Sequence, residues 1–172
     1  MLTHDPARGE WRAGAIRYMM IRPDALMGLF AELPPEMRGA ALAALGRSVR
    51  RHGGKSARSY QAGGAATPAA LLATITETAA ELGWGLWDLR HDGEELVLAV
   101  SNSPFVAGAG PGPHPVCAPI AGMLAALAEL VFAGDIPAVS GEHACAATGA
   151  ACCRFTARRA APPVATAAAP DR

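Results

Sequence analysis

The sequence has few aromatic residues and no excess of charge of either sign. Aromatic side chains make up 5% of the 172 residues, and fifteen basic residues balance fifteen acidic ones. Because proteins that bind nucleic acid usually carry a basic surface, this balance argues against a nucleic-acid partner. Hydrophobic residues make up 51% of the chain, although many of them are alanine. A chain of this length can form one compact domain, to whose core the few large side chains must contribute most.

The N-terminal stretch "MLTHDPARGEWRAGAIRYMMIRPD" lacks the apolar core of a signal peptide and carries charges throughout. The sequence therefore predicts a cytoplasmic protein, whose four cysteines are expected as thiols or metal ligands rather than as structural disulfides. The stretch 116–134 approaches the length of a membrane span. It contains Glu129 and an early Pro119, which favour a buried amphipathic helix instead.

Several cofactor-binding motifs are missing from the sequence. No GxGxxG motif follows an expected strand, and "GAGPGP" (108–113) is a loop interrupted by prolines. "GGKS" (53–56) resembles part of a phosphate-binding loop, but the full motif needs a glycine in place of Val49 and a preceding strand. The cysteine spacing of an iron–sulfur site is missing too. The sequence thus indicates neither a dinucleotide nor an iron–sulfur cofactor.

Hydrophobic periodicity and turn residues predict an α+β fold with an antiparallel sheet and packed helices. Thr67 is expected to cap a helix that Gly83 ends, and Asp92-Gly93 to form a hairpin turn. Gly53-Gly54 are expected to end an earlier helix. The expected elements are a strand over 15–21, helices over 23–54, a helix over 67–83, a hairpin over 84–104, a flexible loop over 105–115, a helix over 117–132 and strands over 136–145 and 152–158.

The domain itself is expected to span residues 15–158. Residues 1–14 are interpreted as a loose lead-in. Residues 159–172 are rich in alanine and proline and are expected to form a disordered tail.

Three of the four cysteines lie in "GEHACAATGAACCRF", together with a glutamate and a histidine. Glu142 and Cys145 are three residues apart, so they reach one ion only if the strand ends and the chain turns there. Cys145 and Cys153 lie on either side of an expected turn at Thr148-Gly149, which brings their sulfurs together. Cys152 then faces the other way from Cys153.

Cys117 opens the helix expected over 117–132, where backbone N–H groups and the helix dipole favour a thiolate. Three thiolates and a carboxylate are a ligand set that a tetrahedral zinc ion accepts. Four protein ligands leave no open position, so such a zinc would be structural and its binding energy would appear as folding energy. The candidate ligands are Cys117, Glu142, Cys145 and Cys153.

Other interpretations of these side chains stay open. Free cysteines are often small buried hydrophobic residues, and redox or disulfide chemistry is a further alternative. The sequence has no CxxC pair, which argues against a zinc-ribbon or thioredoxin-like site. His143 is an alternative ligand to Glu142. His114 could form a nucleophile pair with Cys117 or Cys145, although no motif supports it.

The segment "HPVCAPIAGMLAALAELVFAGDIPAVSGEHACAATGAACCRF" resembles the C-terminal half of a 4-vinyl reductase domain. In that family a cysteine opens a helix containing Ala-Gly, and a strand, a Glu-x-x-Cys, a glycine turn and a Cys-Arg-Phe follow. The matching residues here are Cys117, Ala121-Gly122, Glu142, Cys145, Gly149 and Cys153-Arg154-Phe155. "AIRYMMIRPDALMGLF" and "ALGRSVRRHGG" resemble the start of the family, so the resemblance covers roughly 15–158.

This resemblance implies a single domain with a TRAPP-subunit-like α+β fold and a homodimer. It also implies a structural zinc, because members of the family that detect aromatic compounds bind zinc at these places. The ligands implied here are Cys117, Glu142, Cys145 and Cys153. The doubled Cys152-Cys153 departs from the family pattern.

Within the family, "GEWRAGAIRYMMIRPDALMGLF" and "NSPF…PVCAPIAGML" most resemble the branch that acts in bacteriochlorophyll biosynthesis. That branch implies binding of a divinyl tetrapyrrole of the protochlorophyllide type, reduction of its vinyl group, contact with other enzymes of the pathway and a position at the edge of the photosynthetic membrane. Since the sequence shows no hydride carrier, it favours binding over catalysis and leaves enzyme activity open. The alternatives are a module that senses a small aromatic compound, a non-catalytic tetrapyrrole carrier and a structural adaptor.

A flat hydrophobic ligand needs apolar walls, a stacking aromatic side chain and one or two polar anchors. The candidate ligand-binding residues are Trp84, Trp87, Phe105, His114, Met123 and Leu127. His91, Arg17 and Arg22 are further candidates for a polar anchor. Each of these residues also has an ordinary interpretation, as a core, dimer-contact or surface side chain.

Overall fold

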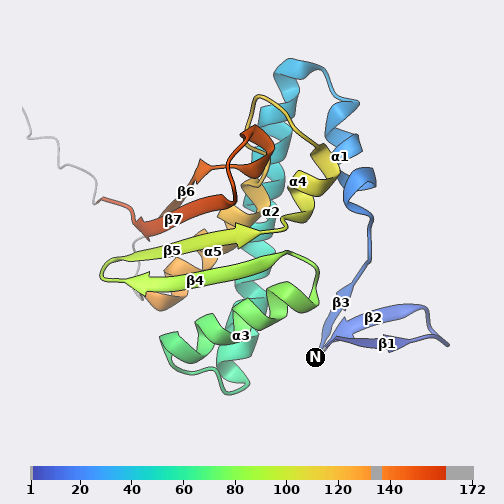
Figure 1. Cartoon of the computed structure of the whole chain (residues 1–172). Coiled ribbons are helices and arrows are strands. Elements are labelled where there is room, and N and C mark those ends of the chain that lie inside the picture. The colour runs from blue at the N-terminus through green and yellow to red at the C-terminus, as the bar shows by residue number, and fades with distance from the viewer. Residues whose placement is uncertain (1, 133–136, 162–172) are drawn as a thin grey trace, which may run out of the picture.

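The computed structural model describes residues 2–132 and 137–161. Its centre is a four-stranded antiparallel sheet with the strand order β4-β5-β7-β6, packed against helices (Figure 1). The strands are β4 (Leu86–Asp92), β5 (Glu95–Ser101), β6 (Ala138–Ala144) and β7 (Cys153–Arg159). The α+β fold with an antiparallel sheet and packed helices is therefore confirmed.

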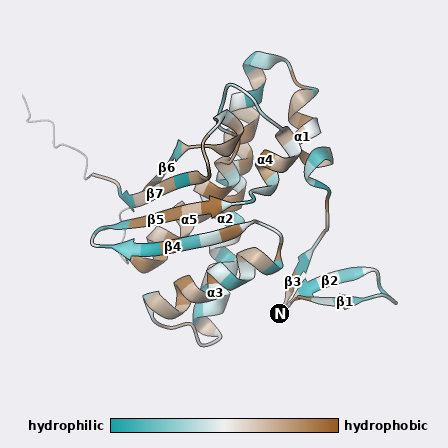
Figure 2. Ribbon diagram, viewed as in Figure 1, coloured by the Kyte–Doolittle hydropathy of each residue, from teal (hydrophilic) through white to brown (hydrophobic). Residues whose placement is uncertain are grey.

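Two helices form the layer behind the sheet. Helix α5 (Ala118–Val131) packs on β5, β6 and β7, and helix α2 (Pro35–Ala62) packs across α5 on the side away from the sheet (Figure 1). Hydrophobic residues concentrate where these layers meet (Figure 2). The large side chains that are fully buried include Leu71, Leu96, Leu98, Ile120, Leu124, Leu127 and Phe155.

The helix and the hairpin expected between 67 and 104 are both present. Helix α3 (Pro68–Glu81) begins after Thr67, whose side chain accepts a hydrogen bond from the Ala70 backbone N–H, as its sequence predicts. The β4–β5 hairpin turns at Gly93, which has a positive φ of 60°.

The sequence predicts that a helix ends at Gly53-Gly54, but helix α2 continues to Ala62. These glycines are places where α5 comes close. A Cβ atom at Gly53 would lie 2.5 Å from the Met123 sulfur, and one at Gly54 would lie 3.4 Å from the Ala126 Cβ. Helix–helix packing therefore offsets the cost of about 1 kcal/mol that glycine imposes inside a helix.

The expected flexible loop over 105–115 begins with a short helix, α4 (Pro104–Ala109). Pro104 occupies the first helical turn, where proline is favoured, and the helix ends at Gly110, which has a φ of 71°. Gly108 allows α4 to lie against the start of α1 (Pro23–Ala31), because a Cβ there would meet the Pro23 carbonyl oxygen at 2.2 Å.

The expected loose lead-in contains strands. Strands β1 (Thr3–Asp5), β2 (Glu10–Ala13) and β3 (Ile16–Tyr18) form a small antiparallel sheet that stands apart from the main body (Figure 1). The turns between them place Gly9 and Gly14 at positive φ, which is the local signal that the prediction missed. The strand expected over 15–21 is shorter and ends at Tyr18.

Ionic contacts stabilise the small sheet. The Glu10 carboxylate lies 2.7 Å from the Arg12 guanidinium and 3.5 Å from that of Arg17, and the His4 and Trp11 rings stack at 4.5 Å. Arg17, a candidate ligand anchor, is thus engaged with Glu10.

The described chain gives no sign of a membrane-spanning helix, since no helix within it is both long and apolar enough to cross a bilayer. At the C-terminus, strand β7 extends to Arg159, the first residue of the expected tail. The rest of that tail, from residue 162 onward, lies outside the described residues.

Candidate functional site

The four predicted metal ligands come together at one end of the main sheet. Cys117 is the N-cap residue of α5, Glu142 lies on β6, and Cys153 is the first residue of β7. Cys145 directly follows β6 and precedes the 3₁₀ helix η1 (Ala146–Thr148). A register shift of β6 against β7 between Glu142 and Ala144 lets Glu142 and Cys145 face the same point despite their odd spacing.

The geometry of this cluster fits a metal ion. One ligand atom from each of the four residues lies within 4.8 Å of the others. The Cys153 sulfur lies 3.7 Å from the Cys117 sulfur and 4.0 Å from the Cys145 sulfur. Zinc–sulfur bonds of about 2.3 Å in a tetrahedron place sulfurs about 3.8 Å apart, so little movement is needed. The cluster could therefore hold a metal ion.

Hydrogen bonds orient the candidate ligands. The Cys117 backbone N–H donates to Glu142 Oε2 at 3.1 Å, and the Ala146 backbone N–H donates to the Cys153 sulfur at 3.4 Å. The Ser103 hydroxyl lies 3.3 Å from the Cys117 sulfur. Glu142 Oε1, in contrast, is buried without a hydrogen-bond partner in the described structure. Leaving a buried acceptor unpaired costs about 1–3 kcal/mol, and a cation at this point would remove that cost.

Burial sets the protonation of the thiols when no cation is present. It raises the pKa of Cys117 well above the usual range, and the nearby Glu142 carboxylate raises it further, although the hydrogen bond from Ser103 lowers it. Burial likewise raises the pKa of Cys145 to about 11. Without a cation, burial therefore outweighs whatever the helix start contributes toward a thiolate at Cys117. A bound cation would reverse this balance.

The alternative ligands lie elsewhere. His143 Nε2 is 2.7 Å from the Thr156 hydroxyl on the exposed side of the sheet, so it does not replace Glu142. His114 is exposed. Cys152 is half-buried and is not among the four clustered residues.

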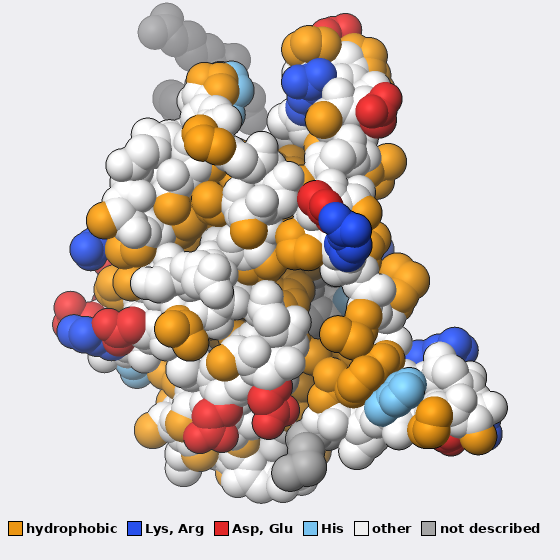
Figure 3. Space-filling model, turned by 45° about the vertical axis from the view of Figure 1, so that its right-hand side comes forward, with side chains coloured by type: hydrophobic (Ala, Val, Ile, Leu, Met, Phe, Trp, Pro, Cys, Tyr) orange, Lys and Arg blue, Asp and Glu red, His pale blue; other side chains and the backbone are white. Residues whose placement is uncertain are grey.

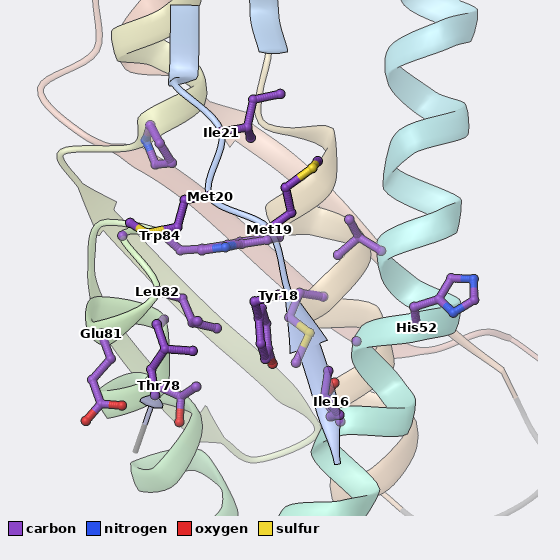
Figure 4. A pocket seen from close by; sticks show the side chains of 18 of the residues that line it. Ile16, Tyr18, Met19, Met20, Ile21, His52, Thr78, Glu81, Leu82 and Trp84 are labelled. Carbon is purple, nitrogen blue, oxygen red and sulfur yellow. The ribbon is translucent and has the colours of Figure 1, made fainter. Parts of the chain in front are cut away.

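A second feature is an apolar pocket of about 800 Å³ between α2, α3, α4 and the segment that joins β3 to α1. Hydrophobic side chains gather around a hollow in this face of the molecule (Figure 3). In the close-up, the segment from Ile16 to Ile21 passes between α2 and α3, and Tyr18 and Trp84 point into the space that they enclose (Figure 4). The apolar walls include Ile16, Met19, Met20, Leu26, Met27, Val49, Ile75, Leu82, Trp84, Trp87, Phe105 and Met123.

Four of the six candidate ligand-binding residues line this pocket, namely Trp84, Trp87, Phe105 and Met123. The Trp84 and Phe105 rings meet edge to face at 5.5 Å. Ligand contact by these residues stays a prediction.

The other two candidates lie outside the pocket. Leu127 lies four residues, or about 6 Å along the helix axis, beyond Met123. It is fully buried in the core and does not line the pocket. His114 is exposed on the loop before α5. The further polar candidates also lie elsewhere: Arg22 pairs with Asp24, and the His91 ring meets Phe132 edge to face.

The polar side chains of the pocket were not predicted from the sequence. Tyr18 comes from β3, Tyr60 from α2, and Thr78 and Glu81 from α3. One signal could have indicated part of this wall: residues 49, 53, 56 and 60 of α2 recur at helical spacing and all line the pocket. The contribution of Tyr18 depends on a long-range contact that no local pattern encodes.

Comparison with known proteins adds a domain match over part of the chain and a fold. Residues 96–159, which include all four clustered ligands, match the sequence model of the vinyl-4-reductase domain. The phenol-responsive sensory domain of the transcription activator PoxR, solved with phenol, is 16% identical with a TM-score of 0.74, covering 92% of this chain and 84% of that one. No curated protein sequence matches the chain.

Two further solved structures are similar. A trafficking protein particle complex subunit 3 from Naegleria fowleri, covalently bound to palmitic acid, is 11% identical with a TM-score of 0.55, covering 81% of this chain and 95% of that one. A vinyl-4-reductase family protein from Methanocaldococcus jannaschii is 16% identical with a TM-score of 0.49, covering 86% and 100%. At these identities the PoxR domain and the trafficking subunit show the fold alone, which confirms the TRAPP-subunit-like architecture.

Proposed function

We propose that this chain, whose residues 96–159 match the vinyl-4-reductase domain family, is a ligand-binding module that holds a small hydrophobic molecule in its apolar pocket. The observation that carries the proposal is the pocket itself. Its volume of about 800 Å³ lies within the range of about 300–1,000 Å³ typical of small-molecule sites, and its walls are mostly apolar and aromatic.

The similar structures support this proposal by analogy. The PoxR domain was solved with phenol and the trafficking subunit with palmitic acid, which are both hydrophobic small molecules. A module of this kind would transmit a signal to a partner protein when the ligand binds, or transfer the ligand to that protein. A homodimer and a cytoplasmic location stay predictions; sedimentation velocity of the purified chain tests the first of them.

The metal that we propose for the cluster is zinc, in a structural role. Three thiolates and one carboxylate are ligands that zinc accepts, and four protein ligands fill a tetrahedral shell. The ion would join the start of α5 to the ends of β6 and β7, close to α4 through Ser103. Elemental analysis is expected to find about one zinc per chain.

A tetrapyrrole is the second candidate ligand, favoured by the size of the pocket, which exceeds what a single aromatic ring fills. In that case the chain would carry a divinyl protochlorophyllide-type pigment or assist the reduction of its vinyl group. A shift of the pigment's Soret band on mixing supports this candidate. Loss of the divinyl spectrum after adding a reductant to the pure protein and pigment would support an enzyme, whereas binding without turnover would support a carrier.

The pocket proposal is tested by titrating the protein with Nile red, a neutral apolar dye whose emission rises when it is bound. Trp84→Ala is expected to weaken binding at least tenfold, because it removes one apolar wall and the ring contact with Phe105. Trp11→Ala is the matched control, since Trp11 lies on β2 and does not line the pocket. Absence of binding to the unmodified protein, or equal binding by both variants, would overturn the proposal.

A further inference from the structure

The pocket is apolar along most of its wall but has hydroxyl groups at one end. Tyr18, Tyr60 and Thr78 supply these groups from three different elements, β3, α2 and α3. The Tyr60 side chain interacts with both of the others. In the close-up, the Tyr18 hydroxyl points toward the end of the pocket where Thr78 and Glu81 lie, away from Met20 and Ile21 (Figure 4).

These hydroxyl groups can serve a ligand as donors and acceptors. The Thr78 hydroxyl donates to the Thr74 carbonyl at 2.7 Å, which leaves the lone pairs of its oxygen to accept. A tyrosine hydroxyl is protonated at neutral pH and can donate, and burial, followed by the contact with Tyr18, raises the pKa of Tyr60 further, to about 12. A ligand oxygen placed here finds both kinds of partner.

The charges around this end disfavour an anion. Glu81 lines the pocket on the exposed side of α3, and its charge is the smallest of the contributions to the raised pKa of Tyr60. The basic side chains that also line the pocket, His52 and Lys55, are exposed, and His52 points away from the cavity (Figure 4). A ligand carboxylate near Tyr60 would therefore lose hydration against mostly apolar walls, with no buried cation among the described lining residues to compensate.

We infer that Tyr18, Tyr60 and Thr78 form a polar subsite that selects hydrophobic ligands with a neutral hydroxyl or carbonyl oxygen and discriminates against carboxylates. The apolar body of the ligand lies against the methionine and tryptophan walls, and its oxygen lies at the hydroxyl end. This inference rests on the proposed function, because it assigns the ligand class of the same pocket.

The test compares three probes with the same two-ring body: biphenyl, 4-phenylphenol and biphenyl-4-carboxylate. Calorimetric titration is expected to show that 4-phenylphenol binds the unmodified protein about three- to tenfold more tightly than biphenyl, as one net hydrogen bond allows. Biphenyl-4-carboxylate is expected to bind more weakly than 4-phenylphenol.

Two variants identify the residues responsible. Tyr60→Phe and Thr78→Val each remove one hydroxyl while keeping the shape, and each is expected to reduce the preference for 4-phenylphenol over biphenyl by about three- to tenfold. Unchanged biphenyl affinity shows that the variants are folded. Thr76→Val is the matched control: Thr76 also donates to a carbonyl one turn earlier, that of Leu72 at 2.9 Å, but it does not line this pocket.

The outcomes separate this inference from the function on which it rests. If the three probes bind equally well, or if both variants keep the preference, the polar subsite is wrong, while weaker binding of all three by Trp84→Ala still supports the pocket. Tighter binding of the carboxylate also overturns the inference. If the probes and Nile red all fail to bind, the proposed function falls together with it.

Discussion

The clustered cysteines give the most direct test of the structure, through the single change Cys145→Ser. A serine hydroxyl is not deprotonated near neutral pH and is a poor zinc ligand, so the variant keeps only three of the four proposed ligands. Cys145 is 1% exposed, and the new hydroxyl would be buried beside the Cys153 sulfur. We expect the variant to lose the ion and with it the link between β6, β7 and α5.

The size of the effect follows from the linkage between binding and folding. An ion present at about 1,000 times its dissociation constant stabilises the folded state by about 4 kcal/mol. For a chain of this length, 1 kcal/mol shifts Tm by about 2–4 °C, so loss of the ion lowers Tm by roughly 8–16 °C. Burying an unpaired hydroxyl adds about 1–3 kcal/mol.

The assay is thermal unfolding followed by circular dichroism, with and without a chelator, together with elemental analysis. The Tm of the unmodified chain is expected to fall when the chelator is added. The Tm of Cys145→Ser is expected to be low without the chelator and to stay unchanged when it is added. Cys152→Ser is the matched control, because Cys152 is half-buried and lies next to Cys153 without belonging to the cluster. It is expected to keep both the ion and the Tm.

Two results would refute this reasoning. One is an unmodified chain that, after refolding with zinc, contains no metal and unfolds at the same temperature with the chelator as without it. The other is equal loss of stability in Cys145→Ser and Cys152→Ser, which would mean that the thiols act as packing groups only.

Two further predictions concern packing and ionisation. Gly122→Ala is expected to lower the free energy of unfolding, measured with denaturant, by about 3 kcal/mol or more, because the new Cβ would lie 2.1 Å from the Gly46 carbonyl oxygen. Gly39→Ala is the control: no atom lies within 4 Å of its Cβ, so it should be neutral or stabilising. The pKa of Tyr60 is about 12 in the folded state and 10 in its ordinary range, so Tyr60 stays protonated to higher pH in the folded than in the unfolded chain. Its contribution to the free energy of unfolding is therefore complete below pH 10 and is lost as the pH rises through about 12. The measurement is phenolate absorbance against pH, and the curve of Tyr60→Phe is subtracted from that of the unmodified chain. The difference is expected to titrate near pH 12, and a difference that titrates at the ordinary pKa of 10 would contradict the prediction.

The cluster of three cysteines and one glutamate could be predicted from the sequence because most of it is local. Cys145 and Cys153 are brought together by the hairpin of β6 and β7, and Cys117 lies at the start of α5, which packs on these strands. What the sequence did not provide was the register shift at Glu142, which depends on how β6 pairs with β7. The sequence also did not indicate how strongly burial raises the pKa of Cys117, because burial depends on the whole fold.

The pocket could be predicted only in part, for two physical reasons. Glycine is typical both of helix ends and of close helix contacts, and Gly53-Gly54 serve the second purpose, so α2 is longer than the sequence suggests. Met123 and Leu127 were both candidate ligand-binding residues on the same helix, but Met123 lines the pocket and Leu127 lies in the core. The wall formed by Tyr18 requires a contact between segments that are distant in the chain.

The wall of the pocket and the cluster of cysteines are encoded by different stretches of the chain. All but three of the 26 residues that line the pocket precede residue 96, whereas all four clustered ligands lie within 96–159, the segment that matches the vinyl-4-reductase domain. If the pocket binds a ligand and the cluster binds an ion as proposed, mutations in the first stretch would alter the ligand preference and leave all four ion ligands in place. An engineer who wishes to retarget this scaffold to a new molecule would leave the C-terminal segment intact and diversify the N-terminal one.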